Sequence, residues 1–391
     1  MPKDTIVIDA DRHIMEPATL WSRYLEPRFR ERVVISDRTW LFADEIDGQP
    51  VTLEGPHADA PPFFTDEHYM AELRDAVENE FDASSNLRAM DREGVDVAIH
   101  FPTAGLVMTW RDGFDPELSC AMCRAYNNWL ADFCATDRAR MRGIAILPVQ
   151  DIAGAVQELR RVKSELDLVG AFLRPNPLDG RALSDPYYFP LYEAASELAM
   201  PILIHEGSAT TLPRLGRGRC SSFGLHIVEH PFEQMVACLA FCGDGVLERF
   251  PELKVGFMES GCGWVPFWLE RMDEHWEHYE LGRNRVTTLP PSEYFKRQCF
   301  VSCEGEERLI GSFLELVGDD LLVTATDYPH PDVVGKFPER TMGDLLNRAD
   351  LSDEVKHKIV FNNPVRLYGL DASSFEKGSV DRSDLHGAAT S

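Results

Sequence analysis

LLVTATDYPHPD, residues 321–332, is an apolar segment of strand character that ends on Asp327. Two further segments of this kind end on side chains that bind metals. Residues 6–13, IVIDADRH, end with Asp11 and His13, and residues 201–207, PILIHEG, carry His205 directly after an apolar run. In parallel α/β proteins the carboxyl ends of the strands meet at one face, where sites are built. The three segments therefore predict a parallel α/β protein with a metal site at that face.

Eight segments have the short, apolar and β-branched composition of buried parallel strands. They are 5–10, 95–101, 143–149, 168–174, 201–206, 254–259, 299–304 and 321–327. Helical patterns separate most of them, the clearest at 116–136, 152–166, 187–199, 232–249, 265–280 and 306–317. This alternation predicts one α/β domain over residues 1–371, folded as a (β/α)8 TIM barrel.

Residues 26–83 interrupt the alternation, because they are too long for a loop between the first strand and its helix. Within them, TWLFADEIDGQPVTL has two extended runs around Asp47-Gly48, which predicts a β-hairpin. We expect the insertion to form a small cap over the barrel mouth. Its apolar pairs are Trp40 with Phe42 and Phe63 with Phe64. The polar tail 372–391 is expected to be disordered or to lie as an arm on a partner subunit.

The overall composition excludes several kinds of partner. The chain has 391 residues and a formal net charge of -26. Nucleic acids and anionic membrane surfaces need a basic patch, so we expect neither as a partner. The N-terminus has no apolar segment of a secretory signal, and no apolar run approaches the roughly 20 residues of a membrane span. Nine cysteines without framework spacing predict reduced, mostly buried thiols and a cytoplasmic protein.

Asp11-x-His13 is the strongest local pattern for a metal site. Alternate residues near a strand end point the same way, so both side chains can reach one ion in the barrel mouth. Glu16 follows at a spacing that brings a second carboxylate to the same space if residues 13–16 turn helically. Pro17 acts against that helical turn, because it restricts Glu16 to extended or turn conformations.

His205 and Asp327 complete a candidate set with the first pair. A lone histidine at a strand end is more often a satisfied core residue, but its partnership with the other three ligand types favours a metal site. A carboxylate at Asp327 can bind a metal and also accept a proton from water bound to that metal. His330 lies in a turn between two prolines and is either a site residue or a loop imidazole.

Two further candidate ligands lie near the sixth predicted strand, one before it and one at its end. Glu259 ends that strand in FMESGCGW and is a candidate general acid, general base or metal ligand. His226 and His230 lie four residues apart in LHIVEHPFEQ, but Pro231 disfavours a helix there. We therefore expect a helix to start near Pro231, with His230 at its beginning and able to point into the mouth.

Arg174 ends the fourth predicted strand in FLRPNP, and Asn176 follows two residues later. A guanidinium binds carboxylate or phosphate through two parallel hydrogen bonds. Arg174 and Asn176 are therefore the candidates for binding a substrate. The alternative for Arg174 is a salt bridge to a site carboxylate.

These residues together resemble the amidohydrolase-related barrel family that includes aminocarboxymuconate-semialdehyde decarboxylase and the aromatic-acid decarboxylases. The resemblance extends from DADRHIMEP to FNNPVRLYGL, and HPFEQM, ESGCGWVPFWLERMDEH and TDYPHPD are similar to an uncharacterised branch. In the decarboxylases, a carboxylate-x-His or His-x-His pair, a histidine after strand five and an aspartate after strand eight hold the metal. The resemblance implies that Asp11, His13, His205 and Asp327 are the ligands here.

The chain departs from this family at strand six, where the decarboxylases carry a catalytic histidine and this sequence has Glu259. Unlike histidine, glutamate does not change charge near neutral pH without a large environmental shift. Glutamate also adds a hard oxygen ligand, so Glu16, His230, Glu259 and His330 are candidate ligands for a second metal. At least one relative with this barrel is a non-haem diiron monooxygenase. An oxygenase function is therefore the alternative.

The first hypothesis is a metal-dependent hydrolase or C–C lyase that uses one zinc, iron or manganese ion and acts on a small carboxylated substrate. Asp327 or Glu259 would be its base. The second hypothesis is a diiron monooxygenase that acts on a small molecule in the same mouth. A third is a barrel that lost activity and serves as a binding scaffold. We also expect a homo-oligomer, with a dimer as the simplest form.

Overall fold

The computed structural model describes residues 5–35, 45–51, 71, 73–207, 215, 219–278, 281–330 and 339–375. Its centre is a sheet of eight parallel strands in the order β1-β5-β6-β7-β8-β9-β10-β11, which follows the sequence. The strands are β1 (Ile8–His13), β5 (Val97–Phe101), β6 (Met141–Ala145), β7 (Gly170–Leu173), β8 (Ile202–His205), β9 (Val255–Met258), β10 (Cys299–Cys303) and β11 (Leu322–Thr324). All eight predicted strands are therefore confirmed, and the fold is a (β/α)8 barrel.

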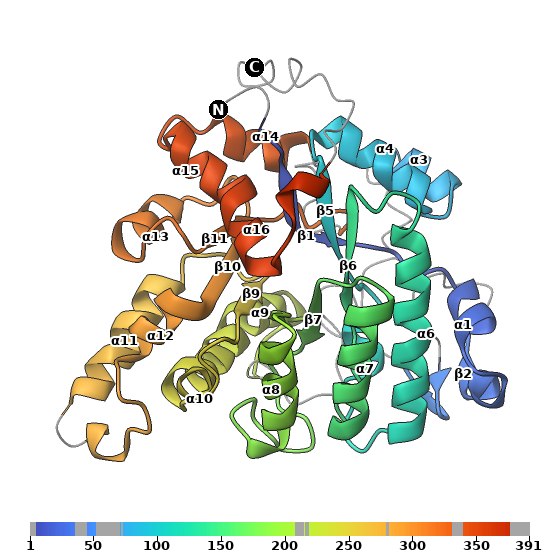
Figure 1. The fold of residues 1–391 in the computed structure, drawn as a ribbon, viewed down its shortest axis with the longest axis horizontal. Coiled ribbons are helices and arrows are strands. Elements are labelled where there is room, and N and C mark those ends of the chain that lie inside the picture. Colours follow the sequence, from blue (N-terminus) through green and yellow to red (C-terminus); the bar gives the residue numbers. More distant parts are fainter. Residues whose placement is uncertain are drawn as a thin grey trace.

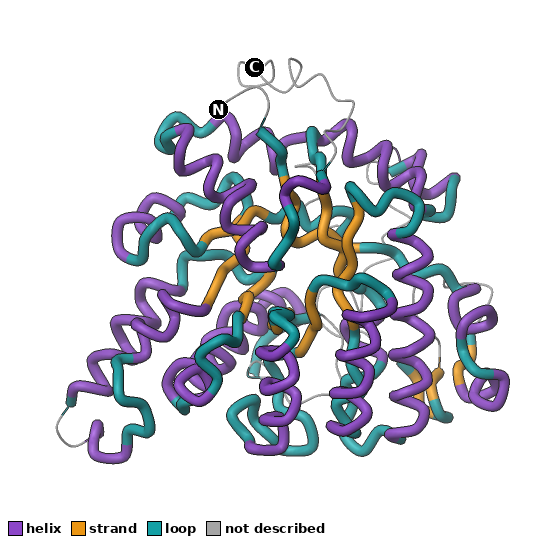
Figure 2. The backbone as a smooth tube through the Cα atoms, in the orientation of Figure 1, coloured by secondary structure: helices purple, strands orange, loops and turns teal. Residues whose placement is uncertain are grey.

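The strands lie inside a ring of helices (Figures 1 and 2). The main helices are α4 (Ala83–Glu93), α6 (Pro116–Cys134), α7 (Ile152–Glu165), α8 (Phe189–Glu197), α9 (Ser222–Cys238), α11 (Val265–Glu277), α12 (Pro291–Gln298), α13 (Ile310–Leu316), α14 (Glu339–Asn347) and α16 (Asn363–Tyr368). Apart from the half-buried Arg142, the residues of the eight strands are buried, since side chains fill the barrel and helices cover its outside.

Aspartate side chains begin several of these helices. Asp82, Asp115 and Asp151 each accept a backbone N–H of the first helical turn. This satisfies donors that have no partner inside the helix. The predicted helix start near Pro231 is wrong, because α9 already begins at Ser222 and carries the proline inside it. Ser221 caps this earlier start by accepting the N–H of Gly224.

The barrel is closed between its first and last strands by a seam rather than by a regular ladder in the described part of the chain. His13 N–H donates to Tyr328 O (2.7 Å), and Asp327 N–H donates to Asp11 O (3.2 Å). Arg12, which is fully buried, reinforces the seam from the outer side of β1. Its guanidinium pairs with Glu93 and with Asp9 and lies 3.9 Å from the ring centre of Tyr328.

The predicted hairpin around Asp47-Gly48 is confirmed. Strand β3 (Glu45–Ile46) pairs antiparallel with β2 (Val33–Val34) and with β4 (Gln49–Pro50). Asp47 and Gly48 have φ values of 55° and 72°, as a two-residue turn of type I′ requires. Arg111 of the barrel donates to Pro50 O (3.0 Å) and so ties the hairpin to the barrel. Trp40, Phe42, Phe63, Phe64 and residues 376–391 lie outside the described residues.

Two expectations from composition can also be compared with the structure. The nine cysteines are free, and all except Cys120 and Cys220 are buried, as predicted. Across the helices that the structure describes, none combines the length and the apolar character that a membrane crossing needs.

Arg12→Met tests the seam. The substitution leaves the buried carboxylates of Asp9 and Glu93 without their cation, so we expect the free energy of unfolding to fall by about 3 kcal/mol or more. Urea denaturation measures the change. The matched control is Arg160→Met, because Arg160 pairs with Glu197 on the surface, where such pairs contribute roughly 0–1 kcal/mol. Equal losses in the two variants would contradict a special role for Arg12.

Candidate metal centre

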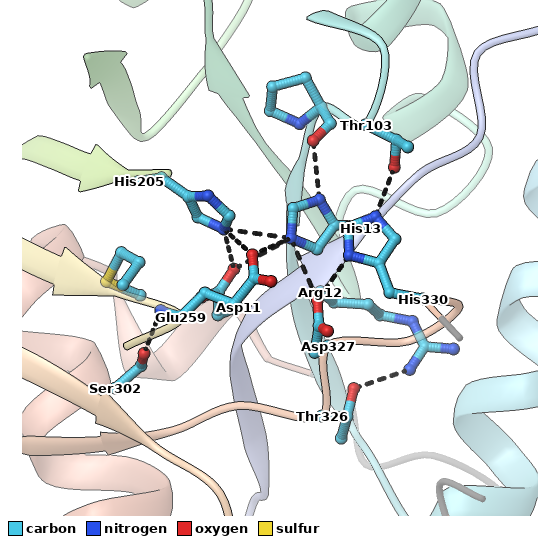
Figure 3. Close-up of polar contacts among 12 residues, drawn as sticks. Asp11, Arg12, His13, Thr103, His205, Glu259, Ser302, Thr326, Asp327 and His330 are labelled. Carbon is cyan, nitrogen blue, oxygen red and sulfur yellow. Dashed lines mark hydrogen bonds and ion pairs between the residues drawn. The ribbon is translucent and has the colours of Figure 1, made fainter. Parts of the chain in front are cut away.

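A β-bulge at the end of β1 aims Asp11 and His13 into the barrel. The register of β1 against β5 shifts between Asp9 and Arg12. In a regular strand Asp9 would share a face with Asp11 and His13. The extra residue at the bulge separates them. Asp9 instead bonds Thr326 and Arg12 at the seam, while the other two side chains reach the mouth (Figure 3).

His13 and His205 face each other across the mouth. Their Nε2 atoms are 3.1 Å apart. His13 Nδ1 is 2.7 Å from Pro102 O, and His205 Nδ1 is 2.5 Å from Glu206 O. A carbonyl oxygen only accepts, so both Nδ1 atoms carry the proton. The lone pairs of both Nε2 atoms therefore point at the same place, which is the arrangement of two imidazoles that share a cation.

Two aspartates bring negative charge to this place. Asp327 Oδ1 is 3.3 Å from His13 Nε2. Asp11 Oδ1 is 3.7 Å from His13 Nε2 and 3.6 Å from His205 Nε2. Both carboxylate oxygens of Asp11 are buried and have no hydrogen-bond partner. A buried carboxylate in this state is costly unless a cation compensates it. The residues present therefore fit a divalent metal ion.

Glu259, His230 and His330 extend the cluster beyond these four residues. Glu259 Oε2 is 3.0 Å from His205 Nε2, and its Oε1 is 3.4 Å from His230 Nε2. His330 Nδ1 lies 2.9 Å from Asp327 Oδ1, within ion-pair distance. Glu259 and Asp327 both have positive φ, 50° and 53°, which side chains larger than glycine adopt at a cost. Such strain is typical of functional sites.

The pKa values of the two facing histidines move in opposite directions. Burial, together with the imidazoles of His330 and His205, lowers the pKa of His13 well below its ordinary value. Burial also acts to lower the pKa of His205, but the carboxylates of Asp11 and Glu259 outweigh it and raise that pKa to about 9. The carboxylates thus favour a positive charge at the point where the two Nε2 atoms meet.

Glu16 is not brought to this cluster, which corrects its expected place among the ligands. Its carboxylate accepts the backbone N–H groups of Thr103 (3.1 Å), Ala104 (2.9 Å) and Gly105 (2.9 Å). The carboxylate therefore caps the short helix α5 (Gly105–Met108), which has no side-chain cap of its own. The restriction that Pro17 places on Glu16 agrees with this position, because it opposes the helical turn that a ligand role required.

The loop that Glu16 holds orients two of the histidines. Pro102 O accepts a hydrogen bond from His13 Nδ1–H (2.7 Å), and Thr103 Oγ1 forms a hydrogen bond with His330 Nε2 (3.0 Å). The sequence patterns did not indicate Thr103 as a site residue. A threonine after a strand carries little information, and its partner lies 227 residues away.

Arg174 is not available as the expected substrate clamp, because it is fully buried and forms a salt bridge with Glu206. Its Nε also donates to Asn176 Oδ1 (2.9 Å), and its Nη2 donates to Gly207 O (2.8 Å). The alternative of a salt bridge is thus the better interpretation, although the partner, Glu206, lies beside the candidate ligand His205 and is not itself one of the candidate ligands. Asn176 is buried with Arg174 and serves the same network.

A family model described as amidohydrolase matches residues 8–370. The chain belongs to the amidohydrolase family. It is 26% identical over 308 residues to the 2-amino-3-carboxymuconate-6-semialdehyde decarboxylase of Dictyostelium discoideum, an alignment that covers 78% of this chain and 81% of that protein. It is also 26% identical over 302 residues to the gamma-resorcylate decarboxylase of Polaromonas sp. strain JS666, with 73% and 86% covered.

A solved structure from Polaromonas sp. JS666 shares the fold of this chain. That dihydroxybenzoic acid decarboxylase, crystallised with manganese and the inhibitor 2-nitroresorcinol, aligns with a TM-score of 0.63 and 19% identity over 95% of this chain and 99% of its own. Family membership and the decarboxylase relatives together identify the amidohydrolase described here as a metal-dependent enzyme.

Glu16→Gln tests whether the loop positions the ligand histidines. The amide turns an NH2 group toward backbone N–H donors, so the loop should lose its fixed position. Because partners behind metal ligands typically contribute 10–100-fold in affinity, we expect the metal dissociation constant to rise by about that factor. Titration of the metal-free protein with manganese or zinc gives the constant. The matched control is the exposed Glu117→Gln, and an equal effect there, or none at Glu16, would contradict the assignment.

Proposed function

We propose that this amidohydrolase is a metal-dependent C–C lyase that removes a carboxyl group from a small organic acid. The observation that carries the proposal is the convergence of Asp11, His13, His205 and Asp327 on one point of the mouth. The names of the relatives support the reaction, because they describe decarboxylases of carboxylated muconate and resorcylate compounds. The hydrolase interpretation has no such support among them.

The four converging residues would hold one divalent ion of zinc, manganese or iron, since imidazole and carboxylate together suit all three. Such an ion supplies Lewis-acid chemistry at a substrate oxygen. Main-chain carbonyls accept hydrogen bonds from Nδ1 of His13 and His205, and these bonds orient the two rings so that their Nε2 atoms face each other. Asp11 and Asp327 would supply two negative charges that balance the charge of the ion.

Decarboxylation also requires a proton donor. The C–C bond breaks, CO2 leaves, the electron pair stays on the substrate carbon, and that carbon then takes a proton. Glu259, in its protonated form, is in position to provide it, because its carboxyl group lies beside the cluster of candidate ligands and 12% of its side chain is exposed to solvent, from which it can take up a proton. Its own N–H donates to Ser302 Oγ (2.8 Å), which holds the residue in its positive-φ conformation. In a hydrolysis, Glu259 or Asp327 would instead take a proton from water.

A second candidate, a dinuclear iron oxygenase, rests only on the number of potential ligands in the mouth. Among the described residues, Asp11, His13 and His205 form one group of potential ligands, and His13, Glu259, Asp327 and His330 form another. With His230, which approaches Glu259, the mouth holds four imidazoles and three carboxylates. A tetrahedral site takes only four ligands, and carboxylate-rich shells suit two irons.

Metal content and oxygen consumption distinguish the two candidates. For protein purified without oxygen or chelator, we expect one divalent ion per chain by elemental analysis. A panel of hydroxylated benzoates, beginning with 2,6-dihydroxybenzoate, the ligand of a structural neighbour, should release CO2 without oxygen uptake. Two irons per chain together with oxygen uptake that depends on substrate would contradict the lyase and support the oxygenase.

Glu259→Gln separates the roles of this residue. If it delivers the proton, the amide keeps its shape but cannot transfer one. Turnover should then fall by about 10²–10⁴-fold while metal content stays unchanged. The exposed Glu270→Gln, on the following helix, is the control. Loss of metal in Glu259→Gln would show that Glu259 is a ligand, and unchanged turnover would exclude it as the proton donor.

A further inference from the structure

The segment ESGCGW, residues 259–264, follows β9 directly and begins with Glu259. Its backbone is unusual at two positions, because Glu259 has a φ of 50° and Gly261 a φ of 65°. Glycine adopts such values freely, but a glutamate adopts them at a cost in free energy and keeps them only where its surroundings impose them. The conformation that places Glu259 at the mouth therefore depends on contacts from outside this loop.

The neighbouring strand β10 and the loop after it provide these contacts. Ser302 Oγ accepts the N–H of Glu259 (2.8 Å), a bond that Figure 3 shows. Glu307 accepts the N–H of Cys262 through one carboxylate oxygen and the N–H of Glu304 through the other, both at 2.8 Å. Burial and this carboxylate raise the pKa of the Cys262 thiol, so the thiol stays protonated and is a third donor to Glu307. Glu307 thus joins the loops at the carboxyl ends of two adjacent strands.

The glycines of ESGCGW make room for this junction. A Cβ atom at Gly261 would lie 3.2 Å from Glu307 Oε2, closer than ordinary van der Waals contact. A Cβ atom at Gly263 would lie 2.3 Å from Leu309 Cδ1. The absence of side chains at both positions therefore lets residues 304–309 approach the main chain of the loop.

Glu307 is itself held from the side away from the mouth. Its N–H donates to Glu304 O (3.1 Å), which closes a turn. Arg348, directly after α14, donates to Glu307 O (2.6 Å) and to Gly305 O (2.9 Å), and its guanidinium pairs with Asp350 (2.7 Å). A carboxylate on a fixed turn can in turn fix the loop that donates to it.

We propose that Glu307 is a positioning residue, which holds Glu259 beside the candidate metal ligands by fixing the loop 259–263. The inference rests on the proposed function, in which Glu259 delivers the proton. Proton transfer needs a donor within hydrogen-bond reach, and a small displacement of such a group lowers the rate strongly. Within the part of the chain that the structure describes, the hydrogen bonds of the Glu307 carboxylate go to the two loops and not to the candidate ligands. Glu307 therefore acts through Glu259.

Amide hydrogen exchange at Glu259 tests the proposal without a substrate. The Glu259 N–H bonds Ser302 and not Glu307, so its exchange rate reports the order of the loop and not the bond that is removed. Glu307→Gln keeps an oxygen for one N–H and turns an NH2 group toward the other, so we expect exchange at Glu259 to become about tenfold faster or more. An unchanged rate would show that Glu307 caps only its own turn and would overturn the proposal. The control, Glu315→Gln, is exposed on α13 and should keep the wild-type rate.

Gly261→Ala disturbs the same junction from the other side and decides the matter if Glu307→Gln fails to fold. The added methyl group meets the Glu307 carboxylate, and alanine disfavours the φ of 65°. Exchange at Glu259 should again accelerate. The matched control is Gly311→Ala, where a Cβ atom on α13 meets nothing within 4 Å. Wild-type exchange at Glu259 in Gly261→Ala, or equal acceleration in Gly311→Ala, would contradict the proposal.

Turnover in a double-mutant cycle separates positioning from a general loss of stability. Glu307→Gln alone should lower kcat about 10–100-fold with KM and metal content unchanged, because it displaces the proton donor and not the substrate or the ion. In a Glu259→Gln background the same substitution should lower kcat less than about twofold, since the group that it positions is already inactive. Equal losses in the two backgrounds would refute the role of Glu307 alone. Full turnover in Glu259→Gln would instead refute the proposed proton donor, and with it the part of Glu307 in the reaction.

Discussion

Two imidazole nitrogens that face each other determine what the mouth of this barrel can do. The Nε2 atoms of His13 and His205 lie 3.1 Å apart, and both rings are held in this orientation by hydrogen bonds that Nδ1–H donates to main-chain carbonyls. Two lone pairs so close together are stable only with a positive charge between them. Asp11 and Asp327 supply the matching negative charge, and the buried oxygens of Asp11 have no other partner. The need for a cation at this point therefore follows from the arrangement of the four side chains and not from any single residue.

Residues outside the cluster keep this geometry in place. Glu16 holds the loop at Thr103 by accepting its backbone N–H. In the same loop, Pro102 O accepts a hydrogen bond from His13 Nδ1–H, and Thr103 Oγ1 forms a hydrogen bond with His330. On the other side of β1, Arg12 ties the first strand to Glu93 and to the end of the last strand. Candidate ligands that come from opposite ends of the chain are therefore fixed relative to one another by the protein itself. Loss of such support typically costs a metal site about 10–100-fold in affinity.

Glu259 distinguishes this site from one built on four ligands alone. Its two oxygens approach His205 and His230, so it connects the first ligand group to α9. A carboxyl group there can donate a proton when protonated, and when ionised it can accept a proton or bind a second ion; the count of bound metal separates the ligand role from the acid–base roles.

Sequence alone determined the barrel and the place of its site. Buried parallel strands have a recognisable composition, and parallel strands bring their carboxyl ends together, so the strand pattern is sufficient to place His205 and Asp327 beside the end of β1. Tertiary structure decided the partners of Glu16 and Arg174. A carboxylate or guanidinium takes whichever partner the fold brings near, and those partners, Ala104 and Glu206, lie 88 and 32 residues away. Local sequence patterns carry no information about such distances, because only packing of the whole barrel sets them.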